Sequence, residues 1–274
     1  MRRVYMVAPS LTIEFNQTFA WPGDSRLFKA REGQRFPGLS RNAILARRYL
    51  ARQNFIQFAD DGRHVGRTTS RKVVHATTRP GRTTVQHWVE LYEEKIEWDS
   101  FMGNKVYIGG NLSPSDFRTI MFPRPEDQAG YKYPRDGLLQ ASGVVKDKEI
   151  RSPQQLDANG YKCLHVVKNG LTTGTTVGRV NGLDSFTRVY TEYGNKETSI
   201  EVAVLPWDRK RGAFSAPGDS GAIVLERGGG IVGMLTGGGG ATGETDTTYV
   251  TPYWWLDEQI KKVLPGCYLY DVVQ

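Results

Sequence analysis

Short apolar runs bounded by glycine, proline and polar residues recur along most of this chain. In the second half they occupy residues 163–170, 173–180, 200–205, 222–225 and 231–236. Runs of this length with turn residues at both ends predict strands. Weaker runs of the same kind precede them, at 11–15, 55–58, 72–76, 84–92, 105–108 and 138–145. The pattern therefore predicts an all-β protein with many short strands.

Helical spacing of apolar residues is confined to two stretches. Residues 40–50 begin with Ser40, which is suited to an N-cap, and place Ile44, Leu45 and Tyr49 on one face. Residues 252–263 begin with a proline suited to a first turn, and apolar side chains then recur at helical intervals. We expect one early helix and one helix near the C-terminus.

Four prolines interrupt the sequence between residues 112 and 138. Because proline limits regular structure, we place a linker at residues 123–135. An N-terminal half then covers residues 1–122, a strand-rich C-terminal unit covers 136–265, and a tail covers 266–274. A chain of 274 residues is long enough for two such units.

The net charge of +7 is unevenly distributed. Residues 1–90 hold 16 Lys and Arg against 6 Asp and Glu, whereas residues 91–274 hold 20 against 23. The basic N-terminal third is suited to an acidic partner. Its arginines are scattered and form no known nucleic-acid-recognition motif, so the sequence does not favour nucleic-acid binding.

The cysteines and the apolar runs indicate the compartment. Cys163 and Cys267 are far apart and show no metal-ligand spacing, so we expect two free thiols and no metal. No apolar run is long enough to cross a bilayer, and the first seven residues are too short and interrupted for a signal peptide. We therefore expect an intracellular, cytoplasmic protein without a membrane partner.

Residues 212–224 place Ser220 between two glycines and then continue into an apolar strand. Gly218 and Gly221 permit a tight turn around this serine. A serine hydroxyl is a useful nucleophile only if a fixed turn projects it and nearby N–H groups face the oxyanion that forms. The alternative is a purely structural turn between two strands.

The string Gly218-Asp219-Ser220-Gly221, preceded by Pro217 and followed by Ala-Ile-Val, resembles the nucleophile loop of the chymotrypsin-like serine proteases. The predicted hairpin after the serine is also found in that family, where its second strand lines the substrate cleft. The resemblance implies that the N–H groups of Gly218 and Ser220 form an oxyanion hole.

A second motif resembles a fungal branch of the same family. Residues 168–174 read Lys-Asn-Gly-Leu-Thr-Thr-Gly, similar to a hairpin early in the second barrel of that branch. Close analogues of residues 205–208, 234–238 and 248–252 occur there too. The resemblance covers about residues 112–265 and is weak before residue 85. It implies an all-β, chymotrypsin-like double β-barrel with a reduced, basic first barrel, a complete second barrel and a C-terminal helix.

A serine nucleophile needs a general base, usually a histidine, and an orienting carboxylate. In the fungal branch the triad aspartate directly precedes a tryptophan, and the matching position here is His87. The histidine of that branch best matches Thr18. The resemblance thus implies an incomplete triad, in which Ser220 alone survives.

Other assignments of the histidines stay open. His87 itself could be the base, with Asp99 or Asp116 orienting it. His64 lies in an Arg-His-Val string like that around the catalytic histidine of the branch, but it follows two aspartates and a glycine instead of an apolar strand. The remaining two lie on expected strands and are weaker candidates: His75 and His165.

The resemblance also implies which residues form the substrate pocket. In the related proteases the residue six positions before the nucleophile forms the pocket floor, and here that residue is Phe214. Thr236, Gly237 and Gly238 match the wall. An aromatic floor without a carboxylate cannot neutralise a buried Lys or Arg charge, so cleavage after apolar or small residues is expected.

We expect peptide-bond hydrolysis by Ser220, acting on a peptide or protein without a cofactor. The alternative is an inactive pseudoprotease that keeps the cleft as a peptide- or protein-binding module. A basic adaptor, whose N-terminal third binds an acidic surface, is compatible with that alternative.

Overall fold

The chain is described by a computed structural model that covers residues 104–190, 196–208, 211–240, 247–263 and 268–269. It also gives the backbone of three N-terminal strands, at residues 4–8, 73–76 and 86–91. The expected helix at 40–50 and the expected strands at 11–15 and 55–58 lie outside the described residues.

The N-terminal strands form an antiparallel sheet in the order β1-β3-β2. They are β1 (Val4–Ala8), β2 (Val73–Ala76) and β3 (Gln86–Leu91). The last two confirm the strands expected at 72–76 and 84–92. That this sheet belongs to a reduced first barrel stays a prediction.

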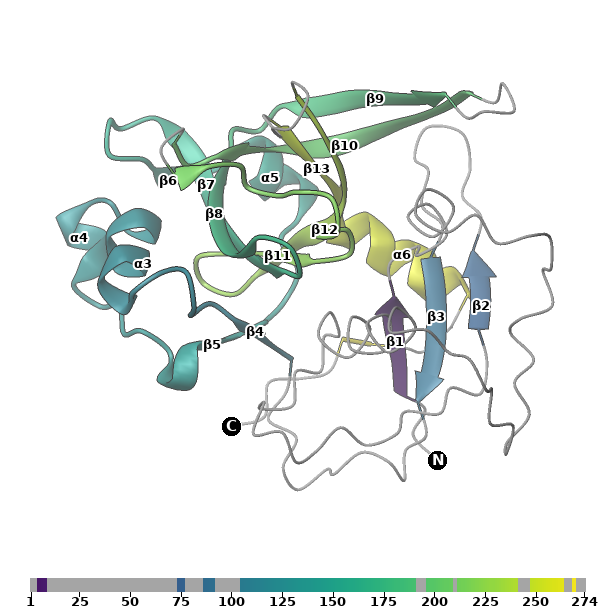
Figure 1. Cartoon of the computed structure of the whole chain (residues 1–274), viewed down its shortest axis with the longest axis horizontal. Coiled ribbons are helices and arrows are strands. Elements are labelled where there is room, and N and C mark those ends of the chain that lie inside the picture. Colours follow the sequence, from purple (N-terminus) through teal and green to yellow (C-terminus); the bar gives the residue numbers. More distant parts are fainter. Residues whose placement is uncertain are drawn as a thin grey trace.

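Six antiparallel strands of the C-terminal part close into a barrel (Figure 1). Around the ring they are β7 (Lys162–Gly170), β8 (Gly174–Val180), β10 (Lys196–Pro206), β13 (Thr247–Pro252), β12 (Ile231–Gly239) and β11 (Ile223–Glu226). The ring closes because β11 pairs with both β12 and β7. The barrel confirms the all-β fold class expected for this part of the chain.

Four further strands lie outside the ring. β4 (Lys105–Tyr107) pairs with β5 (Leu138–Gln140), and β6 (Gln155–Leu156) pairs with the start of β7. β9 (Asp184–Tyr190) pairs with β10, and the two extend beyond the barrel as a ribbon (Figure 1).

Alternation along the strands divides the apolar side chains between two clusters. On β7, Leu164 and Val166 face the barrel interior, where they pack with Val180, Val204 and Val250. Val167 lies on the opposite face of β7 and belongs to the second cluster. That second cluster lies between the barrel and the helices, and it includes Phe117, Met121, Leu225, Ile231 and Leu256.

The helices cover this outer cluster. α3 (Pro114–Met121) begins at Ser113, whose hydroxyl accepts a hydrogen bond from the Asp116 N–H, and Pro114 occupies the first turn, where its missing N–H costs nothing. Three shorter helical segments follow: α4 (Pro125–Gln128), η3 (Arg135–Gly137) and α5 (Asp147–Arg151).

α6 (Tyr253–Val263) confirms the expected C-terminal helix. It follows β13 directly and contacts β12 and β13, with Leu256 and Ile260 buried. Within the part of the chain that is described, no helix is both long and apolar enough to cross a membrane.

Candidate active site around Ser220

The serine turn is built by two glycines in left-handed backbone conformations. Gly218 has φ of 100° and Gly221 has φ of 87°, values that side chains with a Cβ rarely adopt. The Gly221 N–H donates to the Leu235 carbonyl at 2.7 Å, which ties the turn to β12. Ser220 is partly exposed at this point. The turn therefore has a fixed backbone.

Asp219, the residue before the serine, is fully buried and points away from solvent into the hairpin of β7 and β8. Its Oδ2 atom lies 3.0 Å from the Lys168 ammonium, which is equally buried. The Thr172 and Thr173 N–H groups donate to Oδ1 at 2.8 and 3.2 Å. The Ala216 N–H donates to Oδ2 at 3.1 Å. A buried carboxylate is tolerated only when it is paired and hydrogen-bonded in this way.

The same network satisfies the buried lysine. Lys168 donates to Asp219, to the Thr173 hydroxyl and to the Gly174 carbonyl, the last at 3.1 Å. The Thr173 hydroxyl in turn donates to Asp219 Oδ2 at 2.6 Å. These contacts connect the motif at residues 168–174 to the serine turn.

Charge and burial act in opposite directions on the pKa values of the pair. Burial would raise the pKa of Asp219, but the Lys168 ammonium and the hydrogen bonds from Thr173, Lys168 and Ala216 outweigh it and hold that pKa below the usual value. Burial lowers the pKa of Lys168, and the Asp219 carboxylate opposes that change. Asp219 is therefore ionised at neutral pH.

Two positions of this region require glycine because neighbouring groups lie too close to the backbone for a Cβ. A Cβ on Gly170 would overlap the Asp219 carboxylate, and a Cβ on Gly218 would overlap the Thr172 hydroxyl. That hydroxyl donates to the Pro217 carbonyl at 2.7 Å. The hairpin and the serine turn thus fit together only because both positions lack a side chain.

The residues expected to form the substrate pocket differ in exposure. Phe214 is 1% exposed and packs in the barrel interior, where its carbonyl accepts a hydrogen bond from Thr176 at 2.6 Å. Thr236 and Gly238 are exposed at the end of β12, and Gly237 between them is partly buried. Their roles as floor and wall stay predictions, as does the oxyanion hole.

The histidines and carboxylates expected to complete a triad are only partly described. Thr18, His64 and Asp99 lie outside the described residues. His87 is on β3, directly opposite His75 of β2 and Ala8 of β1 in the strand register. The sheet thus brings two of the candidate histidines together, which the sequence alone did not indicate.

Asp116, one expected orienting residue, lies in the first turn of α3, which Ser113 caps. Its Oδ2 accepts a hydrogen bond from the Ser113 hydroxyl at 2.8 Å, and its Oδ1 lies 4.0 Å from Arg211. Both contacts serve the N-terminal end of the helix. The interaction of Asp116 with His87 stays a prediction, because only the backbone of His87 is described.

His165, one of the weaker candidates, lies on β7, where a strand was expected. Its ring is buried on the face of β7 opposite Lys168, with Nδ1 3.1 Å from Gln155 Oε1 and Nε2 3.7 Å from Cys163 Sγ. Burial lowers its pKa to about 4. Burial also raises the pKa of Cys163 to about 11, so this thiol is protonated and inert at neutral pH.

The sequence did not reveal the structural roles of Lys168 and Asp219. The available signal was Lys168 itself, which follows Leu164-His-Val-Val and shares the strand face of Leu164 and Val166. A lysine there needs a buried anion, because an unpaired charge in a barrel interior is too costly. Asp219 was noted only as part of the serine motif.

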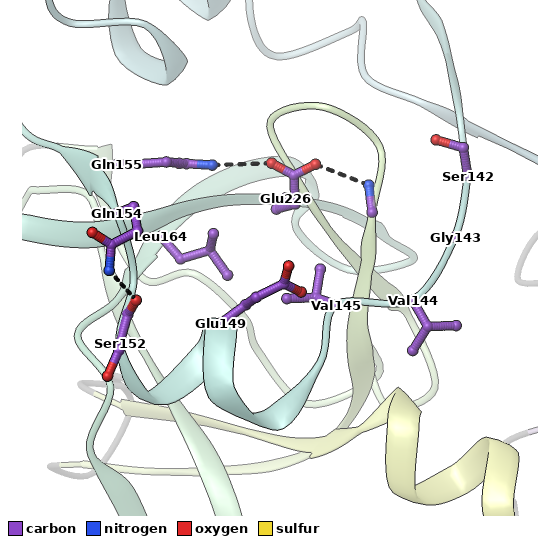
Figure 2. Close-up of a pocket in the computed structure, with 11 residues that line it drawn as sticks. Ser142, Gly143, Val144, Val145, Glu149, Ser152, Gln154, Gln155, Leu164 and Glu226 are labelled. Carbon is purple, nitrogen blue, oxygen red and sulfur yellow. Dashed lines mark hydrogen bonds between the residues drawn. The ribbon is translucent and has the colours of Figure 1, made fainter.

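A cavity of about 400 Å³ lies at the opposite end of β11 from the serine turn (Figure 2). Glu226 lines it and is bonded to Gln155 at 3.0 Å and to the Gly230 N–H at 3.0 Å. Glu149, Val145 and Leu164 line it as well. None of the predicted site residues contributes to this cavity. Among the described residues, no group of His, Cys, Asp and Glu is suited to hold a metal ion.

No protein-family model matches the chain, and no curated protein matches it. Among solved structures, the chain is similar to Cellulomonas bogoriensis chymotrypsin, with 18% identity over 69% of this chain and 70% of that one, and a TM-score of 0.35. It is also similar to a glutamic-acid-specific serine protease, with 16% identity over 70% and 71% of the two chains and a TM-score of 0.38. Thermobifida fusca protease A gives 18% identity over 69% of each chain and a TM-score of 0.33.

Because these identities and TM-scores are low, any function has to be inferred from the residues of this chain. By name, the first of these structures is a chymotrypsin, the second a serine protease and the third a protease. The particular resemblance to a fungal branch stays a prediction. The chain itself combines a closed six-stranded barrel and a C-terminal helix with a Gly-Asp-Ser-Gly turn.

Proposed function

We propose that the chain is a serine protease domain in which Ser220 is the nucleophile for peptide-bond hydrolysis. The observation that carries this proposal is the fixed turn around Ser220. Gly218 and Gly221 give it a positive-φ backbone, and the buried Asp219 holds it to the β7–β8 hairpin. A turn that is fixed before substrate arrives is what a hydroxyl nucleophile requires.

In this proposal the Ser220 hydroxyl oxygen attacks the carbonyl carbon of the scissile bond. The hydroxyl proton passes to a base, for which His87 is the candidate, and then to the departing amine as the C–N bond breaks. Water hydrolyses the resulting ester and regenerates the serine. N–H groups of Gly218 and Ser220 would stabilise the oxyanion of each tetrahedral intermediate.

The strand edge at the end of β12 is suited to bind an extended peptide substrate. β11 pairs with β12 as far as Met234, whereas Gly237–Gly239 pair with Thr247–Tyr249 of β13 only, among the described strands. The opposite edge of this glycine segment therefore has no described strand beside it. An extended peptide that adds to this edge gains main-chain hydrogen bonds, and the absent side chains let its backbone approach closely.

A fluorophosphonate probe tests the proposal directly, because it modifies only an activated serine hydroxyl. We expect stoichiometric labelling of the full-length chain, with the modified peptide containing Ser220. Ser220→Ala should abolish the labelling, while Ser142→Ala, an exposed serine outside the turn, should leave it unchanged. Labelling at another serine, or none with intact substrate turnover, would refute the role of Ser220.

The alternative is an inactive pseudoprotease that keeps the cleft as a peptide- or protein-binding module. In this alternative Ser220 stays unlabelled, and peptides bind equally well to the wild type and to Ser220→Ala. Binding of an acidic partner by the basic N-terminal third is a further proposal that fits this alternative.

A further inference from the structure

The ribbon formed by β9 and β10 has an open edge. Among the described strands, β9 pairs with β10 alone, from Asp184 opposite Val202 to Tyr190 opposite Lys196. The ribbon extends away from the barrel in Figure 1. An unpaired strand edge presents a row of N–H and C=O groups and is a template for pairing with another strand.

The two faces of this ribbon differ in exposure. On one face, the Thr187 hydroxyl lies 2.6 Å from the Ser199 hydroxyl, and Ser199 is only 8% exposed. On the other face, Phe186 is 68% exposed. A large aromatic side chain that is left in water beside an open edge gains free energy if a partner covers it.

The strand is complementary to itself. In an antiparallel pairing with Phe186 opposite Phe186 of a second copy, Asp184 lies opposite Arg188 and Ser185 lies opposite Thr187, on both sides of the twofold axis. Aromatic pairs, hydroxyl pairs and opposite charges are the combinations that stabilise antiparallel strands. Each of these pairs occurs through the same surface of both copies, as a closed twofold dimer requires.

We propose that this chain forms a dimer through antiparallel pairing of the β9 edges, with the twofold axis at Phe186. The proposal concerns the ribbon and does not depend on the proposed function of Ser220. Asp184 already forms an ion pair with Arg151, whose guanidinium lies 2.8 Å from Asp184 Oδ2. A carboxylate can accept hydrogen bonds from a second guanidinium, here that of Arg188 in the other copy. Placing the axis at Ser185 instead would put Asp184 opposite Phe186 and lose both charge pairs. The charges therefore select the register and favour a second copy over an unrelated strand.

Charge exchange between two variants tests the dimer in its proposed register. Arg188→Asp places two carboxylates opposite each other at each end of the pairing, and Asp184→Arg places two guanidinium groups there. Each variant alone should dimerise about tenfold or more weakly than the wild type in sedimentation velocity. An equimolar mixture of the two should recover dimers, because every opposed pair in the mixed dimer again has opposite charges.

Two further variants complete this experiment. Phe186→Ala should weaken the wild-type dimer, because the central aromatic pair is lost. Tyr161→Ala removes another exposed aromatic side chain, 72% exposed and outside β9, and should leave dimerisation unchanged. The proposal is wrong if the wild type stays monomeric at all accessible concentrations. It is equally wrong if either charge variant dimerises like the wild type, or if the mixture fails to recover dimers that the wild type forms.

Discussion

Lys168 and Asp219 form a fully buried ion pair, with Nζ and Oδ2 3.0 Å apart, although 51 residues separate them in the sequence. Lys168 lies on β7 and begins the hairpin motif, whereas Asp219 directly precedes Ser220. The hairpin motif at residues 168–174 and the serine motif are therefore one structural unit. The backbone of the serine turn depends on a lysine that is not itself near the surface.

Replacing the lysine should destabilise the protein strongly. Lys168→Met leaves Asp219 buried without its cation, and breaking a buried pair by removing one partner costs about 3–5 kcal/mol. The free energy of unfolding in urea measures this loss. Labelling of Ser220 by a fluorophosphonate should fall as well, at temperatures where the variant is still folded, because Asp219 no longer holds the turn.

An exposed ion pair of the same type serves as the control. Lys261 and Asp257 lie 2.6 Å apart on α6, four residues apart, with the lysine half exposed. Lys261→Met should cost no more than about 0.5 kcal/mol and should not affect labelling. Equal losses in the two variants would show that the buried pair has no special role.

Gly218→Ala should impair the serine turn without unfolding the barrel. Its φ of 100° disfavours any residue with a Cβ, and that Cβ would overlap the Thr172 hydroxyl. If the Gly218 N–H stabilises the oxyanion, displacing it should lower the rate of hydrolysis about a hundredfold or more. Gly143→Ala is the matched control, because Gly143 has φ of 71° but nothing lies within 4 Å of an added Cβ. It should cost about 1–2 kcal/mol of stability and leave the rate unchanged.

His165 should make stability depend on pH in the acid range. Burial lowers its pKa to about 4 from an ordinary value of 6.5. Between these values the unfolded chain takes up a proton that the folded chain does not, so stability falls as the pH falls through this window. At pH 4.5 the loss should be on the order of 2–3 kcal/mol relative to pH 7. Urea unfolding of His165→Gln should show a flatter pH dependence than the wild type, and parallel curves would contradict this explanation.

Most strands of the barrel were predictable from the sequence because they combine a clear apolar run with a turn signal, whereas β13, Thr247-Thr-Tyr-Val-Thr-Pro252, lacks such a run and was not predicted. β7, β8, β11 and the first part of β12 lie where the pattern placed them. β9 was missed because its first five residues, Asp184-Ser-Phe-Thr-Arg188, contain a single apolar side chain and only Val189 and Tyr190 follow. Its pairing with β10, rather than burial of its side chains, makes it a strand.

The site was predictable only where a local motif defined it. Ser220 and its two glycines could be identified because a tight turn is a property of a few consecutive residues. The ion pair of Lys168 with Asp219 and the register that sets His75 opposite His87 are properties of strand pairing over long sequence distances. A single sequence contains no signal for such pairings beyond the general need of a buried charge for a partner.

Substrate preference provides a fourth prediction. If Phe214 is the floor residue, the pocket has an aromatic ring where a cationic side chain would need a carboxylate as counter-ion. Cleavage of a mixed peptide library should therefore follow apolar or small residues. Mass-spectrometric identification of the new C-termini measures this preference. Predominant cleavage after arginine would contradict the assignment of Phe214 as the floor.

The last prediction distinguishes an active protease from an inactive pseudoprotease. If Thr18 and His87 stand where a histidine and an aspartate belong, the wild type should hydrolyse peptides poorly, and the double change Thr18→His with His87→Asp should raise the rate. Base and orienting residue act as a unit, so neither single change should suffice. Initial rates on a chromogenic peptide, compared across the wild type, both single variants and the double variant, measure this dependence. Each protein should also be tested with Ser220→Ala, which must abolish any gain.

The competing assignment, with His87 as the base, gives the opposite results in the same set of variants. The wild type would then be robustly active, His87→Ala would lower its rate by several orders of magnitude, and changes at Thr18 would have no effect. His75 lies directly opposite His87 in the sheet, so His75→Ala is the matched control for any disturbance of that strand pair. A loss in His87→Ala that His75→Ala does not reproduce would assign the proton transfer to His87, because both variants remove an imidazole from the same cross-strand pair.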